Sequence, residues 1–178
     1  MKNIVLIGMR AAGKTKIGKK LAQKLNKKFV DLDNEIEKST QKKIFEIVNE
    51  KGWKEFRKIE QNICAKFSKQ KNLVISTGGG IVEDNDNINN LKKNGFLVFL
   101  QIPLEILKKR LTKKNQRPSL TGKNLADEID EIWEKRKNKF LTSADLIFSC
   151  NHFSENSEKD TEKISENLAK KIISIFKN

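Results

Sequence analysis

The chain has 178 residues and a mass of 20.5 kDa, which suits one domain and leaves little room for a second. Its apolar runs fall far short of the ~20 residues that a membrane-spanning helix needs, so we expect a cytoplasmic protein without membrane association. The formal net charge of +14 could suit a nucleic-acid binder, but the lysines are spread along the whole chain among acids, which favours a solvated lysine face.

Short apolar runs alternate with segments of helical periodicity. Runs without polar alternation are typical of strands covered on both faces of a parallel sheet, and the alternation of strands and helices predicts a doubly wound α/β domain. The predicted strands are 4–7, 29–32, 73–75, 96–100 and 146–148. The predicted helices are 14–25, 44–67, 85–94, 104–111, 126–140 and a last one around 164–176, after a loop at 151–160. Because such sheets bind ligands at the carboxyl ends of their strands, residues that follow a strand are the candidates for function.

The first predicted strand leads into Gly-Met-Arg-Ala-Ala-Gly-Lys-Thr at residues 8–15, which is the GxxxxGKT pattern. Its backbone N–H groups and the start of the next helix would bind a polyphosphate. Lys14 would reach the β and γ phosphates, and the Thr15 hydroxyl is a hard oxygen ligand suited to Mg²⁺. We therefore predict a nucleoside triphosphate site at Gly8, Ala11, Ala12, Gly13, Lys14, Thr15 and Lys16.

Two carboxylates, Asp31 and Asp33, lie at the end of the second predicted strand. At this spacing one can face the metal while the other approaches a second substrate. The alternative is a solvated strand end that caps the next helix. After the third strand come three glycines, Gly78, Gly79 and Gly80, whose bare backbone would let N–H groups approach a ligand.

Arginine is rare in this chain, because only five of its 37 basic residues are arginines. An arginine offers a planar fork for carboxylate or phosphate that lysine cannot copy. Arg57 shares a predicted helix face with Glu60, which could hold its guanidinium in place. Arg136 could be an ordinary surface charge, but its neighbours are lysines, which favours a functional role.

Taken together and in this order, the motifs resemble the shikimate kinase family over nearly the whole chain. The resemblance implies a fold of the nucleoside monophosphate kinase type, a P-loop three-layer sandwich with a five-stranded parallel sheet. It further implies one domain over residues 1–178, with a substrate-binding helical segment at about 33–60 and a lid at about 112–124. The residues that carry it are the P-loop, Asp31-Leu32-Asp33, Phe56-Arg57 with Glu60, Gly78-Gly79-Gly80, Arg110, Arg117-Pro118 and Arg136 with Ala144-Asp145.

The activity implied by the resemblance is transfer of the γ-phosphate of ATP, with Mg²⁺, to the 3-hydroxyl of shikimate by a monomeric enzyme. Asp33 would contact the ring hydroxyls and accept the proton, and Asp31 would reach the metal through water. Arg117 would come from the lid to the phosphates as a catalytic cation beside Lys14, and Arg110 would pack against adenine. Shikimate itself would be bound by Asp33, Arg57, Gly78, Gly79, Gly80 and Arg136.

Three residues depart from the family's usual pattern and bear on affinity: Ala11 in place of a glycine, Lys16 in place of Ser or Thr, and Trp53 in place of Glu. The main rival is another small-metabolite kinase of the same fold, such as a gluconate kinase or a nucleoside monophosphate kinase. The glycine turn with Asp33, Arg57 and Arg136 favours a small carboxylated polyol. A rival of another class is a nucleic-acid-associated P-loop ATPase. Such a protein would need a basic face with interleaved aromatic residues, whereas the aromatic residues of this chain fall mostly at core-like periods.

Overall fold

The computed structural model describes residues 1–112, 125–150 and 158–177. The described residues form one sheet of five parallel strands in the order β2-β3-β1-β4-β5. Each helical connection returns the chain to the same end of the sheet, so that all five carboxyl ends share one edge. The strands are β1 (Asn3–Ile7), β2 (Lys28–Asp31), β3 (Leu73–Ser76), β4 (Gly95–Gln101) and β5 (Leu146–Ser149).

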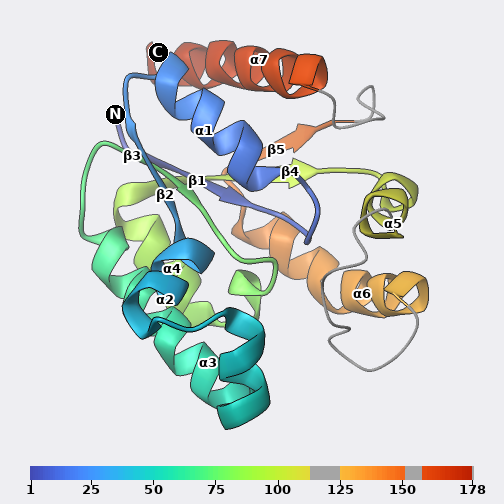
Figure 1. Ribbon diagram of the computed structural model, residues 1–178. Helices are drawn as coiled ribbons and strands as arrows, with labels where there is room; N and C mark the ends of the chain where they lie inside the picture. The colour runs from blue at the N-terminus through green and yellow to red at the C-terminus, as the bar shows by residue number, and fades with distance from the viewer. Residues whose placement is uncertain (113–124, 151–157, 178) are drawn as a thin grey trace.

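Helices cover both faces of the sheet and make the predicted three-layer α/β sandwich. Figure 1 shows α1 and α7 side by side over one face, while α3, α4 and α6 lie on the opposite side. The helices are α1 (Lys14–Lys24), α2 (Leu32–Thr40), α3 (Ile44–Ser68), η1 (Ile81–Glu83, a 3₁₀ turn), α4 (Asn85–Asn94), α5 (Leu104–Thr112), α6 (Leu125–Ser143) and α7 (Glu158–Lys177).

The inner strands are covered on both faces, as their sequences predict. Every residue of β1 and of β3 is buried, which explains why neither run shows polar alternation. The same prediction is wrong for β5, where half-buried and exposed positions alternate and Ile147 is 43% exposed. The reason is that β5 is an edge strand, paired on one side only, with β4.

Two helix boundaries and one kink inside a helix differ from the sequence prediction. The helix α2 begins at Leu32, the last residue of the predicted strand, because the Asp31 carboxylate caps it by accepting a hydrogen bond from Asn34 N at 3.3 Å. In α3, Gly52 has φ 77° and ψ 169°, which kinks the helix before the segment that carries Arg57. Residues 158–160 belong to α7 and not to the predicted loop.

The carboxyl edge of the sheet is tied together where β3 ends. Thr77 donates to Leu6 O from its hydroxyl at 2.9 Å and from its backbone N–H at 3.3 Å. The turn after β3 therefore lies directly beside the loop after β1. This places the three glycines next to the GxxxxGKT loop, so that both can contribute to one site.

Candidate active site

The GxxxxGKT loop encloses the Lys14 side chain. Lys14 is only 7% exposed, and its Nζ donates hydrogen bonds to the carbonyls of Gly8 and Met9 at 2.8 and 2.9 Å. Gly13 has φ 87° and lets the chain turn into α1. No side chain among the described residues caps α1 by a hydrogen bond, so its first amide groups can bind an anion.

Ala11 occupies a strained position in this loop. Its φ of 63° lies in the left-handed region that favours glycine. Its carbonyl accepts a hydrogen bond from Nη1 of Arg110 at 3.2 Å, so α5 is tied to the loop. Burial lowers the pKa of Arg110 from its ordinary value. Arg110 thus contacts the loop backbone, which its predicted place beside adenine did not anticipate.

A hydroxyl and a carboxylate meet at the start of α1. Thr15 Oγ1 donates to Asp31 Oδ2 at 2.6 Å, which brings together the two residues predicted to hold the metal. Asp31 also caps α2, which confirms the capping part of the structural alternative, but Asp31 is buried and is not a solvated strand end. These are hard oxygen donors of the kind that Mg²⁺ takes beside phosphate oxygens. Among the described residues no group of three or more His, Cys, Asp or Glu side chains could hold a metal by itself.

The glycine turn packs too closely for side chains. A Cβ at Gly79 would lie 2.9 Å from the backbone nitrogen of Arg10, within the GxxxxGKT loop. A Cβ at Gly78 would lie 2.8 Å from Asp33 Oδ1 and 3.2 Å from Glu60 Oε1. The turn therefore joins the phosphate-binding loop on one side to the carboxylates of Asp33 and Glu60 on the other.

Arg57 is held from three directions. Its Nη1 donates to Glu60 Oε2 at 2.6 Å, and its Nη2 donates to Glu83 Oε2 at 2.9 Å. Its guanidinium carbon lies 5.7 Å from the ring centre of Trp53 and 5.2 Å from that of Phe56, within the range of cation–π attraction. The predicted pairing with Glu60 is confirmed, and the aromatic contacts give Trp53 a structural role beside the same guanidinium.

Arg136 reaches the same place from α6. Its Nε donates to Glu83 Oε1 at 2.9 Å, and its Nη1 donates to Gly79 O at 3.2 Å. Arg136 is buried, so the reading as an ordinary surface charge is wrong. Two guanidiniums from different helices thus converge beside the glycine turn, which suits recognition of a carboxylate.

The two glutamates that contact these arginines are perturbed in opposite directions. Burial raises the pKa of Glu60, which the charge and hydrogen bond of Arg57 oppose only in part. For Glu83, burial also acts to raise the pKa, but the hydrogen bond and charge of Arg136, with the charge of Arg57, outweigh it and lower the pKa. Glu83 is therefore held as a carboxylate between the two arginines.

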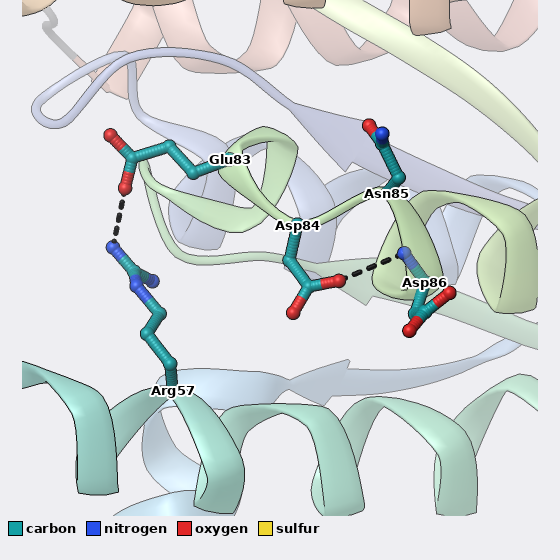
Figure 2. A pocket seen from close by; sticks show the side chains of 5 residues that line it. All are labelled: Arg57, Glu83, Asp84, Asn85 and Asp86. Carbon is teal, nitrogen blue, oxygen red and sulfur yellow. Dashed lines mark hydrogen bonds and ion pairs between the residues drawn. The ribbon is translucent and has the colours of Figure 1, made fainter.

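A pocket of about 430 Å³ opens beside these residues. Figure 2 shows Arg57 rising from α3 toward Glu83, with Asp84 and Asp86 on the other side of the pocket. Asp84 caps α4 by accepting from the backbone N–H groups of Asp86 and Asn87 at 2.8 and 3.3 Å. A structural role thus accounts for Asp84, whereas Arg57 and Glu83 point to recognition of a ligand.

Sequence reasoning missed some residues of the site. Glu83 was not predicted, and neither was the ion pair at 3.8 Å between Arg10 and the buried Glu128. Among predicted residues, Lys16 lies exposed in the first turn of α1. Arg117 and the rest of the predicted lid lie outside the described residues, except Thr112, which ends α5.

Chemically, this edge of the sheet offers two adjoining sites. One has a backbone nest, a lysine and a metal-suited oxygen pair, and can hold the triphosphate of a nucleotide. The other has two guanidiniums for an acid group and carboxylates for hydroxyl groups. Since the glycine turn contacts both, an acceptor hydroxyl and a terminal phosphate could meet there.

Comparison with known proteins supports this description. The family model described as "Shikimate kinase" matches residues 10–174. The shikimate kinase of Persephonella marina is 44% identical over 149 residues, covering 84% of this chain and 89% of its own. Shikimate kinase 2 of Photorhabdus laumondii is 37% identical over 174 residues, covering 96% of this chain and 98% of its own.

Solved structures agree with the sequence relatives. The shikimate kinase of Acinetobacter baumannii, solved in complex with shikimate, superposes with a TM-score of 0.88 at 29% identity, covering 98% of this chain and 94% of its own. That of Bacteroides thetaiotaomicron gives a TM-score of 0.86 at 36% identity, with coverage of 96% and 98%. No helix in the described part of the chain is long and apolar enough to cross a membrane.

Proposed function

The chain belongs to the shikimate kinase family, and we propose that it transfers the γ-phosphate of ATP to the 3-hydroxyl of shikimate at this sheet edge. The observation that carries the proposal is the glycine turn. It lies against Arg10 of the phosphate-binding loop on one side and against Asp33 and Glu60 on the other. The two reactants would therefore face each other across it.

On the nucleotide side, the amide groups at the start of α1 and the Lys14 ammonium bind the β and γ phosphates. Thr15 and Asp31 are 2.6 Å apart and would hold Mg²⁺, with Asp31 acting through water. The metal supplies charge that offsets the negative charge of the phosphates. Arg117, which lies outside the described residues, adds a second cation to the phosphates when the lid covers them.

On the acceptor side, Arg57 and Arg136 bind the carboxylate of shikimate. The backbone of the glycine turn would approach the ring beside Asp33 and Arg57, whose side chains occupy the space that side chains at Gly78 and Gly80 would fill. Fixing the acid group in this way sets the direction of the ring hydroxyls. Specificity for an acid over a neutral polyol follows from the two guanidiniums.

Asp33 completes the reaction by holding the attacking hydroxyl. The 3-hydroxyl oxygen forms a bond to the γ-phosphorus as the bond to the β-γ bridging oxygen of ATP breaks, and the hydroxyl proton passes to the Asp33 carboxylate. The products are ADP and shikimate 3-phosphate. Because phosphoryl transfer depends mostly on positioning and charge stabilisation, the orientation that Asp33 gives matters as much as its basicity.

We also propose that the enzyme acts as a monomer in the cytoplasm, where ATP and free metabolites are available. Both reactant sites described above come from a single chain, so the chemistry needs no second copy. Sedimentation of the purified protein at working concentrations tests the monomer: one species near 20.5 kDa is expected, and a larger stable species would contradict it.

The function is tested by incubating the purified protein with Mg-ATP and one acceptor at a time, and by identifying the product by phosphorus NMR. Shikimate should be phosphorylated at the 3-position in step with ADP release. Gluconate and nucleoside monophosphates test the rival kinases, and DNA tests the nucleic-acid-associated ATPase. ATP hydrolysis stimulated by DNA, without phosphorylation of shikimate, would refute the proposal.

A further inference from the structure

Glu83 occupies the position that a bound acid would take between the two arginines. Its Oε2 accepts from Arg57 Nη2, and its Oε1 accepts from Arg136 Nε, both at 2.9 Å. Figure 2 shows the Glu83 carboxylate facing the Arg57 guanidinium at the rim of the pocket. One carboxylate bridging two guanidiniums, one oxygen to each, is the arrangement by which a carboxylate ligand would bind here.

The charges of this cluster are already balanced. Arg57 and Arg136 carry two positive charges, and their ion-pair partners Glu60 and Glu83 carry two negative charges. A third carboxylate brought by a substrate would give the cluster a net negative charge in a partly buried place, which is electrostatically unfavourable. Movement of one of the two glutamates away from the arginines would remove this excess negative charge when an acid binds.

Glu83 is the one that can move. The side chain of Glu60 is 2% exposed and lies 2.6 Å from Arg57 on the same helix, whereas that of Glu83 is 37% exposed. Glu83 also ends the short turn η1 and borders the pocket, so its carboxylate can rotate toward solvent. The lowered pKa of Glu83 agrees with a carboxylate that is held by the arginines and that competes for them.

We propose that Glu83 is an internal competitor for the substrate's carboxylate, and that shikimate must displace it from Arg57 and Arg136 in order to bind. This inference rests on the proposed function of the site. Competition with the substrate's carboxylate makes Glu83 a specificity-determining residue. It sets how strongly an acid must interact with the two arginines before it is accepted, and it makes binding of weakly interacting acids unfavourable.

The test is the affinity of the whole protein for shikimate without nucleotide, measured by calorimetry. Glu83→Gln keeps the shape of the side chain and removes its charge. Because a neutral amide competes for the two guanidiniums more weakly than a carboxylate does, shikimate binding should tighten by roughly tenfold. Shikimate methyl ester carries no carboxylate, so its affinity should be the same for the wild type and for Glu83→Gln.

Glu134→Gln is the matched control, since Glu134 is exposed on the same helix as Arg136. This substitution changes the net charge of the protein by the same amount as Glu83→Gln. The affinity of Glu134→Gln for shikimate should equal that of the wild type. Glu83→Ala serves as the second variant, and thermal unfolding checks that each variant is folded. The Glu83→Ala variant should also bind shikimate more tightly than the wild type.

Two results would overturn the inference while leaving the proposed function intact. In the first, the wild type binds and phosphorylates shikimate, but both folded Glu83 variants bind it equally or more weakly, which would make Glu83 an organiser of the arginines. In the second, shikimate and its ester gain affinity alike. If the wild type neither binds nor phosphorylates shikimate, the proposed function itself fails and the inference fails with it.

Discussion

Adding one methyl group at Gly80 should impair the substrate site without harming the fold. A Cβ at this position would lie 2.9 Å from Cζ and 3.0 Å from Nη1 of Arg57, and closer still to Nη2. The guanidinium would have to move away from its present position. The backbone of Gly80, with φ −101° and ψ 4°, is one that alanine also adopts, so Gly80→Ala introduces no backbone strain.

The size of the effect follows from what Arg57 does. A displaced guanidinium loses its charge-assisted contact with the substrate's carboxylate, which is worth about 1.5–3 kcal/mol. Because 1.4 kcal/mol corresponds to a tenfold change in an equilibrium constant, the KM for shikimate should rise roughly 10- to 150-fold. The KM for ATP and the unfolding temperature should change little, since the contact lies outside the phosphate-binding loop and the core.

A double-mutant cycle separates this mechanism from a general loss of function. Arg57→Ala alone should raise the KM for shikimate far more than the KM for ATP. Adding Gly80→Ala to Arg57→Ala should then have almost no further effect, because the side chain that the methyl group displaces is gone. Additive losses, or an unchanged KM for shikimate in Gly80→Ala, would refute the reasoning.

Three further experiments test other parts of the molecule. Asp33→Asn should leave ATP binding largely intact while strongly lowering kcat with shikimate, and turnover near the wild-type rate would show that Asp33 does not hold the attacking hydroxyl. Thr15→Val removes the hydroxyl that lies 2.6 Å from Asp31 and should raise the Mg²⁺ concentration needed for half-maximal rate; an unchanged requirement would contradict the metal assignment. Burial raises the pKa of the Cys64 and Cys150 thiols to about 12, so little thiolate is present at pH 8. A disulfide reagent should therefore label the two thiols only slowly until the protein is unfolded. Fast labelling of the native enzyme would contradict the burial of these thiols.

The parts of the fold that could be predicted are those encoded locally. The buried runs of β1 and β3 and the GxxxxGKT pattern carry their own periodicity and turn chemistry, so the sequence sufficed for them. The pairing of Arg57 with Glu60 was likewise readable, because one helical turn separates them. The start of α2 was not, since Leu32 follows Phe29 and Val30 in a strand-like pattern while the Asp31 side chain already caps the helix.

The residues that could not be predicted depend on tertiary structure. Glu83 meets two arginines from α3 and α6 only after the chain has folded, and nothing around it in sequence marks that meeting. Gly80 was predicted to offer a bare backbone to a ligand, whereas the structure shows that its missing side chain makes room for Arg57. The contact of Arg110 with the Ala11 carbonyl spans 99 residues, which no local pattern encodes.

The most direct test of the central claim is a crystal structure of the enzyme with shikimate, Mg²⁺ and a non-hydrolysable ATP analogue. The account predicts the terminal phosphate beside Lys14, the carboxylate of shikimate on Arg57 and Arg136, and its 3-hydroxyl between Asp33 and that phosphate. Shikimate bound elsewhere, with its hydroxyls out of reach of the nucleotide, would contradict the account.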